Sequence, residues 1–387
     1  MRKLAIVTTH PIQYYAPVFQ LLQQRGQIAI KVFYTWGETS VKKHDPGFGK
    51  VIDWDMPLLD GYPFEWVNNT ATNPGSHHFK GIVNPDLIAQ INAWQPGAVL
   101  VFGWAYHSHL KAIRYFKNKL PVYFRGDSTL LDEQTGIRSI LKGILLKWIY
   151  RHIDHAFYVG TNNKAYFKKY GLKNDQLSFA PHAIDNNRFS VDRMPEALQL
   201  RQDLNINKDE ILVLFAGKLE DKKSPLLLLD AFLLLNEPYV HLLFVGDGLL
   251  ETVLRSEAKE HKRIHFMGFQ NQSYMPVVYQ ACDLFCLPSK GPGETWGLAV
   301  NEAMACGKAV LVSDKCGCAI NLVTNANGII FKSDDITDLR SALKTLITDK
   351  EKLNEYGNQS KILVDTWSFV HIANAIEKII INEPFIN

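Results

Sequence analysis

Short apolar runs alternate with segments in which apolar residues recur every three or four positions along the first half of the chain. The short runs are typical of buried strands and the longer periodic segments of helices. The predicted strands are Leu4–Thr8, Ile28–Tyr34, Ala98–Phe102, Pro121–Phe124 and Ala156–Val159. The predicted helices are Tyr14–Arg25, Pro85–Trp94, Ser108–Lys117, Ile137–Arg151 and Asn163–Tyr170. This alternation predicts an α/β fold with a parallel sheet.

The same alternation starts again in the second half. The predicted strands are Ile211–Ala216, Val240–Val245, Leu284–Leu287 and Ala309–Val312. The predicted helices are Leu249–Glu260, Tyr274–Ala281 and Gly297–Ala305. A further helix is predicted to open at Ser224-Pro225, since serine is a good N-cap and proline suits the first helical position.

The polar segment Asp185–Asn207 separates the two patterns, so we predict two Rossmann-like domains, 1–190 and 191–364. Residues 365–387 form another amphipathic helix that either caps the second domain or crosses back to the first, and we predict that it crosses back. Two such lobes place a ligand in the cleft, near the carboxyl ends of their strands. Residues 35–80 are irregular, and so long a loop is usually functional or mobile.

Composition adds bounds to this picture. The chain has 387 residues, of which 47% are hydrophobic and 21% are charged, so both halves can bury a core and wholesale disorder is excluded. Its 42 Lys and Arg against 39 Asp and Glu give a formal net charge of +3. A dedicated nucleic-acid binder usually concentrates far more positive charge, so we predict no nucleic-acid partner. A local basic groove for a phosphorylated small molecule is compatible with this balance.

The five cysteines lie in one stretch, at Cys282, Cys286, Cys306, Cys316 and Cys318. An odd number without paired C-x-x-C elements favours reduced, buried thiols over disulfides or a zinc site. The first apolar run is too short for a signal peptide, and no uncharged stretch reaches the ~18 residues that span a bilayer. We therefore expect a cytoplasmic protein.

The most informative local feature is a pair of carboxylates, Glu294 and Glu302, separated by seven residues across a predicted strand–helix junction. A helix that begins near Gly297 directs free N–H groups and its positive dipole end out of the sheet, as an anion site requires. Glycine there lets a phosphate approach the backbone closely. Glu294, on the loop, is placed to accept hydrogen bonds from hydroxyls, and a ribose diol would supply the donors that Glu302 needs. The alternative is that both glutamates are ordinary solvated residues.

A second feature is the lysine-rich turn after a predicted strand, where Lys218 follows Gly217 and Lys223 precedes the next helix. Two ammonium groups at the carboxyl end of a parallel sheet suit a diphosphate. The turn lacks the G-x-x-x-x-G-K-[ST] pattern of a Walker loop. A solvated lysine-rich loop is the alternative.

Three further sequence features give weaker signals, and each allows more than one interpretation. Gly246-Asp247-Gly248 follows a strand, but the third glycine of the dinucleotide fingerprint is missing. Asp53 and Asp55 could hold a divalent cation, although loop aspartates are more often solvated, and we predict no metal site. The basic amphipathic helix 137–151 either packs its apolar face inside the first domain or lies on an anionic membrane. We favour packing, with peripheral contact with the cytoplasmic membrane as the alternative.

Four features of the second half occur together in the order found in the retaining glycosyltransferases of family 4, which the chain resembles. They are Gly217-Lys218-Leu219 with Lys223, the strand end Phe244–Gly248, the strand within Ala281–Ser289, and the stretch Glu294–Gly307 with its Glu-Ala-Met-Ala-Cys-Gly helix. The resemblance covers nearly all of the chain and is specific in the second half. It implies the GT-B fold, in which two Rossmann-like lobes with parallel sheets face a central cleft.

The resemblance also implies roles for individual residues. Lys218 and Lys223 would bind the donor diphosphate, and both are predicted to be catalytic. Glu294, the third predicted catalytic residue of the second half, would bind the transferred sugar, and Glu302 would bind the ribose. The remaining predicted donor contacts are Gly217, Gly246, Gly268, Phe269, Trp296, Gly297 and Leu298.

The first half departs from the family pattern in two places. The family's glycine-rich loop is replaced by Thr9-His10-Pro11-Ile12-Gln13-Tyr14-Tyr15, a start similar to that of some bacterial surface-polysaccharide glycosyltransferases. The family's active-site histidine is replaced near Arg125-Gly126-Asp127. His10, His107 and Asp127 are therefore alternative candidates for the residue that assists the acceptor. The predicted acceptor contacts are Gln13, Tyr14, Trp104, Tyr106 and His107.

These features favour an enzyme that moves a sugar, with retention of configuration, from a nucleotide-diphosphate donor to a glycan or lipid-linked acceptor. The expected setting is the synthesis of a bacterial surface glycan, and the expected reaction needs no metal or other cofactor. A sugar-nucleotide epimerase or a phosphorylase on the same fold is one alternative. A non-catalytic subunit that binds a sugar nucleotide is another.

Overall fold

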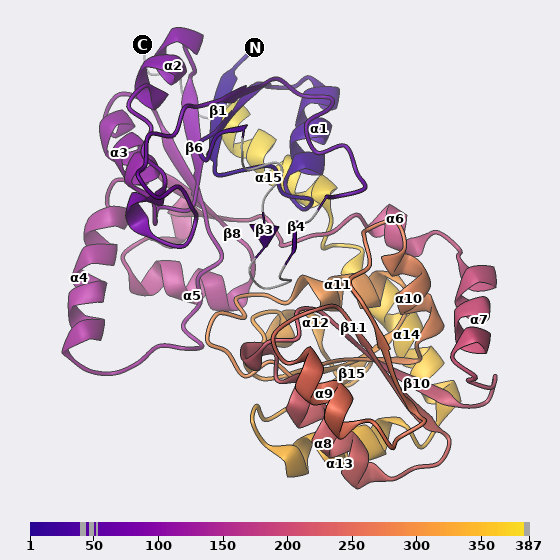
Figure 1. The fold of residues 1–387 in the computed structure, drawn as a ribbon. Coiled ribbons are helices and arrows are strands. Elements are labelled where there is room, and N and C mark those ends of the chain that lie inside the picture. Colours follow the sequence, from indigo (N-terminus) through magenta and orange to yellow (C-terminus); the bar gives the residue numbers. More distant parts are fainter. Residues whose placement is uncertain (39–43, 46–49, 52, 383–387) are drawn as a thin grey trace. The chain divides into compact units, whose positions relative to one another are not determined.

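The computed structural model describes residues 1–38, 44–45, 50–51 and 53–382 (Figure 1). Part of the predicted loop 35–80, namely residues 39–43, 46–49 and 52, lies outside the described residues. The chain divides into two compact units. Unit 1 comprises Met1–Lys43, Met56–Pro181 and Phe369–Asn387, and unit 2 comprises His44–Asp55 and His182–Ser368. Among the described helices, none has both the length and the apolar character needed to cross a bilayer.

Unit 1 is built on a seven-stranded parallel sheet in the order β5-β2-β1-β6-β7-β8-β9. Its strands are β1 (Lys3–Thr8), β2 (Ala29–Tyr34), β5 (Phe64–Trp66), β6 (Ala98–Phe102), β7 (Val122–Arg125), β8 (His155–Tyr158) and β9 (Leu177–Phe179). Strand β6 is apolar and buried at every position, because a parallel sheet is covered by helices on both faces. The helices are α1 (Ala16–Arg25), α2 (Leu87–Trp94), α3 (His107–Phe116), α4 (Ile137–Tyr150), α5 (Thr161–Lys169) and α15 (Phe369–Asn382), with short 3₁₀ turns at Phe79–Gly81 and Asn174–Gln176.

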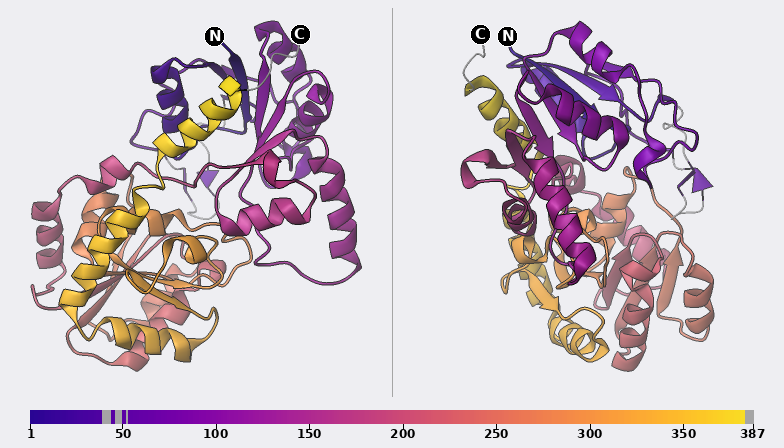
Figure 2. Two further views of the ribbon diagram at one scale, coloured as in Figure 1. Left: turned by 180° about the vertical axis from the view of Figure 1, so that it is seen from behind. Right: turned by 90° about the vertical axis from the view of Figure 1, so that its left-hand side faces the viewer.

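The last helix, α15, packs beside α1, so the end of the chain completes unit 1 (Figures 1 and 2). The Arg25 guanidinium donates to the Glu377 carboxylate at 2.7 Å and to the Asn374 side chain at 2.8 Å. Arg2 donates to the backbone oxygen of Ile380 at 2.6 Å. These contacts fix α15 on the side of α1.

The boundary between the units differs from the predicted one. Residues 182–190 belong to unit 2 rather than to a first domain ending at 190. Ile184 bridges in parallel to Ser368, and the Asn186 side chain donates to the Val364 carbonyl at 3.2 Å. The return crossing therefore begins at Phe369, after a short segment that stays with unit 2.

Unit 2 is built on a six-stranded parallel sheet in the order β12-β11-β10-β13-β14-β15. Its strands are β10 (Ile211–Ala216), β11 (Val240–Val245), β12 (Ile264–Met267), β13 (Leu284–Leu287), β14 (Ala309–Ser313) and β15 (Gly328–Phe331). Its helices are α6 (Asn186–Ser190), α7 (Met194–Asp203), α8 (Pro225–Leu235), α9 (Glu251–Glu257), α10 (Met275–Ala281), α11 (Leu298–Ala305), α12 (Ala319–Leu322), α13 (Ile336–Leu346) and α14 (Lys350–Val364), with a 3₁₀ turn at Asp221–Lys223. A two-residue antiparallel pair, β3 (His44–Asp45) and β4 (Lys50–Val51), belongs to the earlier segment of this unit.

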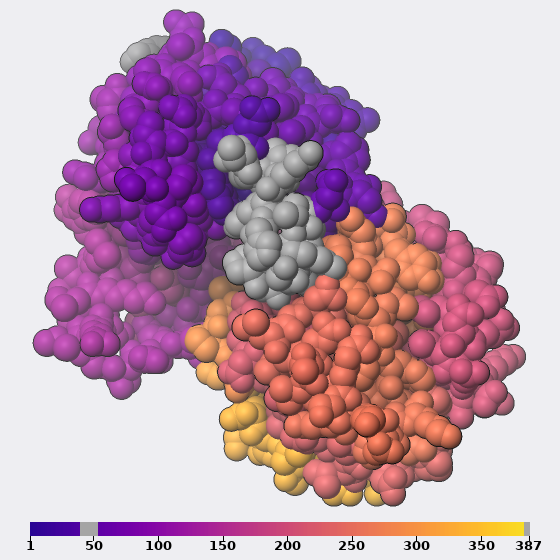
Figure 3. Space-filling model, viewed as in Figure 1, coloured from indigo at the N-terminus to yellow at the C-terminus, as the bar shows by residue number. Residues whose placement is uncertain are grey.

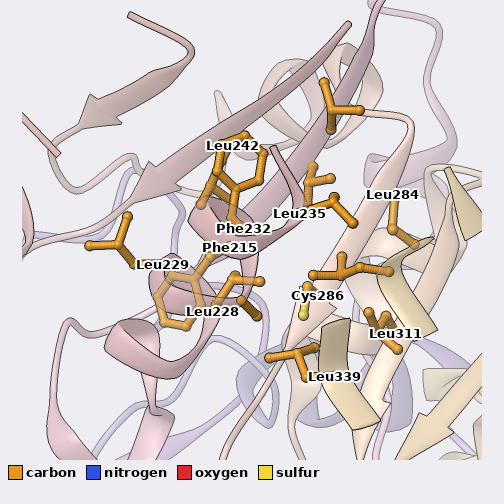
Figure 4. Close-up of a cluster of buried hydrophobic side chains, with 14 of the residues drawn as sticks. Phe215, Leu228, Leu229, Phe232, Leu235, Leu242, Leu284, Cys286, Leu311 and Leu339 are labelled. Atoms are coloured by element: carbon orange, nitrogen blue, oxygen red, sulfur yellow. The ribbon is translucent and has the colours of Figure 1, made fainter. Parts of the chain in front are cut away.

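One face of this sheet and the helices α8 and α13 enclose a continuous apolar core (Figure 4). The labelled side chains are Phe215, Leu228, Leu229, Phe232, Leu235, Leu242, Leu284, Cys286, Leu311 and Leu339. All five cysteines are free and buried, as predicted for small apolar side chains. Burial raises the pKa of each thiol, for example that of Cys282 to about 12, so the thiols stay protonated and unreactive.

The sequence pattern does not predict β5, β9, β12 or β15. Each has only three or four residues and lies at an edge of its sheet, where half-buried positions interrupt the apolar run. Ser224 occupies the N-cap position of α8 as predicted, but it adopts a φ of +50° and its hydroxyl donates to the Asp221 carbonyl at 3.4 Å instead of capping the helix. Pro225 opens α8 as predicted.

Candidate active site

At the carboxyl edge of the unit 2 sheet, the loops that follow β10 and β11 are hydrogen-bonded to each other. The N–H of Gly217 donates to the Val245 carbonyl and the N–H of Leu219 to the Asp247 carbonyl, both at 3.0 Å. A Cβ on Gly246 would lie 2.1 Å from the Gly217 oxygen, and its φ of +130° favours glycine as well. The Gly-Asp-Gly strand end is therefore explained by the close packing of two turns, without a dinucleotide fingerprint.

Lys223 is a half-buried lysine at the end of the turn after β10. Its ammonium forms an ion pair with the Glu294 carboxylate, and the two side chains are 17% and 8% exposed. The hydroxyl of Ser289 donates to the same carboxylate oxygen at 2.9 Å. The alternative of solvated loop residues is therefore wrong for Lys223 and Glu294. A buried ion pair adds little net stability, so this pair favours a role in binding or catalysis.

The two loops that carry this pair are joined a second time. The N–H of Lys290, in the loop after β13, donates to the Lys222 carbonyl at 2.9 Å, and its ammonium contacts the Asp221 carboxylate at 2.8 Å. Lys218 lies half-buried in the same turn as Lys223. Since β10 and β13 are neighbours in the sheet, their carboxyl ends bring Lys218, Lys223 and Glu294 to one place.

Gly297 stands at the N-cap of α11, as predicted, with a φ of +97°. A Cβ there would lie 2.9 Å from a Leu287 methyl group and 3.8 Å from a carboxylate oxygen of Glu294. No side chain caps this helix end among the described residues, so its first amides and the positive end of its dipole are suited to an anion.

The side chain of Trp296 anchors the loop before α11. Its indole N–H donates to the Asn301 side chain at 2.8 Å, and its ring packs on those of His182 and Trp367. The Trp296 side chain is therefore structural, and a donor contact at this position would have to come from the backbone.

Glu302 is 5% exposed in the second turn of α11, which excludes an ordinary surface residue. The Tyr279 hydroxyl donates to one carboxylate oxygen at 2.8 Å, and the Gln272 amide lies 3.5 Å from the other. Sequence reasoning missed Ser289, Tyr279 and Gln272. Ser289 acts on Glu294 from the same loop, five residues earlier, whereas Tyr279 and Gln272 reach Glu302 from 23 and 30 residues away, and no local spacing connects them to it.

Gly268 and Phe269 follow β12 and join the same edge, because the Phe269 N–H donates to the Asp247 carboxylate at 3.0 Å. Trp54 packs against the Phe269 ring with a centroid distance of 6.0 Å. The Asp55 carboxylate accepts hydrogen bonds from the backbone and the hydroxyl of Ser273. Asp55 is thus used in anchoring this segment. Within the described part of the chain, no group of three His, Cys, Asp or Glu side chains is arranged to hold a metal ion.

The candidate residues of unit 1 follow the adjacent strands β1, β6 and β7. His10, after β1, contacts the Thr9 hydroxyl through Nδ1 at 2.9 Å and packs edge-on against Trp36. Gln13 and Tyr14 are half-buried in the turn that leads to α1. These three residues therefore share one turn at the carboxyl edge of the sheet.

Asp127, after β7, acts electrostatically on two phenols of neighbouring loops. Burial and then the Asp127 charge raise the pKa of Tyr15 to about 12, and the same two causes raise the pKa of Tyr106. Trp104 is half-buried and packs against the apolar cluster that contains Tyr150. The structure thus brings Asp127 and Tyr106 together. The exposed His107 instead packs on Phe79, with a centroid distance of 6.0 Å.

A histidine that the sequence did not single out, His109, is fully buried near this edge. Its Nδ1 lies 2.9 Å from the Gly103 carbonyl and its Nε2 lies 2.8 Å from the Thr35 hydroxyl. Burial lowers its pKa to about 4, so the ring is neutral; Nδ1–H then donates and Nε2 accepts. His109 ties the ends of β2 and β6 together and has a structural role.

Arg125 of the Arg-Gly-Asp stretch is buried and also structural. Its guanidinium donates to the carbonyl oxygens of Ala180 at 2.7 Å and Pro181 at 2.8 Å. It therefore anchors the last residues of this segment of unit 1 to the carboxyl end of β7.

Residues 197–362 match the family model described as glycosyl transferases group 1. A D-inositol 3-phosphate glycosyltransferase from Nocardia farcinica is 28% identical over 221 residues, which cover 54% of this chain and 48% of the relative. An alpha-galactosylglucosyldiacylglycerol synthase from Streptococcus pneumoniae is 22% identical over 196 residues, covering 48% of this chain and 51% of the relative. The chain therefore spans about half the length of the curated relatives it matches.

Two solved structures are similar over almost the whole chain. Anabaena HepE, in complex with UDP and glucose, has a TM-score of 0.72 at 19% identity, covering 99% of this chain and 100% of that one. WaaG, a glycosyltransferase involved in lipopolysaccharide biosynthesis, has a TM-score of 0.68 at 15% identity, with coverages of 98% and 100%. With the two parallel sheets, these likenesses confirm the predicted GT-B fold class. The family match supports a resemblance to glycosyltransferases in the part of the chain where the motifs of the second half indicate it.

Proposed function

We propose that this chain, whose residues 197–362 match the model of the glycosyl transferases of group 1, is an enzyme that transfers a sugar from a nucleotide-diphosphate donor to an acceptor hydroxyl with retention of the anomeric configuration. The observation that carries the proposal is the ion pair between the half-buried Lys223 and the buried Glu294, beside the N-terminus of α11. The pair supplies a cation for a leaving diphosphate and a carboxylate for sugar hydroxyls within one site.

The proposed reaction needs no strong protein base. The bond between the anomeric carbon and the diphosphate oxygen breaks, and the acceptor oxygen forms the new bond to that carbon on the same face. The acceptor proton passes to the departing phosphate oxygen. Negative charge grows on the diphosphate during this step, and Lys218, Lys223 and the amides at Trp296–Leu298 would stabilise it.

The donor is proposed to lie along the carboxyl edge of unit 2. Glu302 would hold the ribose, Glu294 the transferred sugar, and Gly268-Phe269 the base. In unit 1, Asp127 and His10 are the candidates that lie among other predicted acceptor residues, while His107 stays an alternative. Gln13, Tyr14, Trp104 and Tyr106 are proposed to contact the acceptor.

The acceptor is proposed to be a glycan or lipid-linked molecule of a bacterial surface, handled on the cytoplasmic side of the membrane. Two likenesses support this setting: one to a synthase named for a glycosyldiacylglycerol, and one to a protein of lipopolysaccharide biosynthesis. No metal is assigned to the reaction, because lysines and a helix end can supply the positive charge that a divalent cation supplies elsewhere.

A thermal-shift panel tests donor binding and its independence of metal together. We expect one nucleoside diphosphate to raise the unfolding temperature of the protein. At a ligand concentration a hundred times its Kd, binding adds about 2.7 kcal/mol to the free energy of unfolding. The shift should be unchanged in EDTA, because the site needs no cation. Loss of the shift in EDTA would contradict metal independence. A flat response to every nucleoside diphosphate would contradict the donor site itself.

A further inference from the structure

The helix α4 (Ile137–Tyr150) presents most of its apolar side chains to solvent. Five large residues are exposed: Ile137 (75%), Ile140 (64%), Leu141 (61%), Ile144 (62%) and Leu145 (45%). Only Leu146, Ile149 and Tyr150 are buried. The favoured sequence prediction, that α4 packs its apolar face inside the first domain, is therefore wrong for its first two turns. Figures 1 and 3 show the helix at the surface of unit 1.

The exposed residues form one continuous face. Each residue turns an α-helix by about 100°, so positions 137, 140, 141, 144 and 145 fall on one side. The opposite side packs on unit 1 through Leu146 and Tyr150, and a Cβ on Gly143 would lie 3.7 Å from the Tyr170 ring. A Cβ at that distance would make an ordinary van der Waals contact, so this side of α4 is packed against unit 1 and the apolar face is turned outward.

Basic residues border this face on both sides. By the same rotation, Arg138 and Lys142 fall along one edge, and Lys147 falls along the other; all three are exposed. The helix has no acidic residue. In the preceding loop, the Glu133 charge is offset by an ion pair with Lys169, and the other two acids are Asp127 and Asp132.

We propose that α4 is a membrane-docking helix that lies in the headgroup region of an anionic lipid bilayer. An apolar face bordered by lysine and arginine matches the boundary between acyl chains and negatively charged headgroups. A second copy of this chain is a poorer occupant, because a symmetric contact would place equal positive charges against each other. One helix about 21 Å long also offers less surface than a stable protein interface of about 800 Å² on each partner needs.

This inference stands apart from the transfer reaction, because it concerns a surface of unit 1 and is measured by binding. The full chain is sedimented with vesicles of equal parts phosphatidylglycerol and phosphatidylcholine, and with pure phosphatidylcholine vesicles. We expect sedimentation with the anionic vesicles and little with the neutral ones. About 1 M salt should release most of the protein, since charges are then screened beyond about 3 Å.

Two variants test the helix. Ile140→Glu/Ile144→Glu is expected to weaken vesicle binding at least about tenfold, and Arg138→Glu/Lys142→Glu by a similar factor. The matched control is Leu234→Glu/Ile362→Glu on helices α8 and α14 of unit 2, where the side chains are 53% and 66% exposed. It adds the same charge and should bind like the wild type. Thermal unfolding shows that each variant is folded.

Three results would overturn the proposal. One is a wild-type protein that stays in the supernatant with anionic vesicles. The second is vesicle binding by Ile140→Glu/Ile144→Glu equal to that of the wild type. The third is a wild-type dimer in analytical ultracentrifugation that this variant breaks, which would assign the face to a second copy of the chain.

Discussion

Replacement of Lys223 by alanine is expected to lower kcat for sugar transfer by about 10²–10³-fold, the loss typical of removing one donor to a developing negative charge. The Lys223 ammonium has three N–H donors, and its pairing with Glu294 leaves others for the diphosphate. Because negative charge grows as the sugar leaves, kcat should fall more than KM for the donor rises. Steady-state release of nucleoside diphosphate measures both constants.

The control for this variant is Lys222→Ala in the same turn. Lys222 is 40% exposed and pairs with Glu220 at 3.4 Å, so its loss should leave kcat within about twofold of the wild type. Lys223→Ala also leaves Glu294 buried without its cation, which costs stability. Thermal unfolding therefore accompanies the assay, and Lys223→Arg, which keeps the charge, serves if the alanine variant is unfolded. Wild-type kcat in folded Lys223→Ala protein would refute the assigned role.

Alanine at Glu302 is expected to weaken binding of the nucleoside diphosphate about 30-fold, with a much smaller effect on kcat. Hydrogen bonds to a charged group contribute about 2 kcal/mol, which corresponds to about 30-fold in Kd. Glu302 is 5% exposed, one of its carboxylate oxygens accepts from the Tyr279 hydroxyl at 2.8 Å, and the Gln272 amide lies 3.5 Å from the other. The proposed function assigns a ribose hydroxyl to this carboxylate. Calorimetry measures the affinity.

A 2′-deoxy ligand makes this test specific. If Glu302 binds the ribose diol, the wild type should bind the 2′-deoxynucleoside diphosphate more weakly, and Glu302→Ala should lose little further affinity for it. Tyr279→Phe, which removes only the protein's own donor, should keep the affinity within about threefold. If the losses of binding free energy caused by Glu302→Ala and by the 2′-deoxy ligand add fully, Glu302 does not bind the ribose 2′-hydroxyl.

The unit 2 half of the candidate site could be predicted from sequence because its parts are local. Gly217 with Lys223 and Glu294 with Gly297 each lie within one strand–loop–helix junction, and parallel strands bring such junctions to one edge. The ion pair between Lys223 and Glu294 follows from the neighbouring positions of β10 and β13, an order that the sequence pattern does not give. The contact between Tyr279 and Glu302 depends on the packing of α10 against α11, which the sequence pattern does not give either.

The first half was less predictable for a physical reason. Edge strands such as β5 are short and half-buried, so no apolar run marks them. The buried His109 is separated from its partner Thr35 by a large span of sequence, and nothing local distinguishes it from His107. For helix α4, the sequence pattern predicts an amphipathic helix correctly but not the surroundings of its apolar face. Amphipathicity alone does not say whether that face packs on protein or lies against another medium.

The most direct test of the proposed transfer is acceptor-dependent release of nucleoside diphosphate by the full chain. A panel of nucleotide-diphosphate sugars is incubated with and without a bacterial lipid and glycan extract, and NMR gives the anomeric configuration of the product. The proposed function predicts turnover of one donor only when acceptor is present, with retained configuration and with loss of turnover in Lys223→Ala. Conversion of the donor into another sugar nucleotide without acceptor, or binding of nucleotide with no release under any combination, would contradict it.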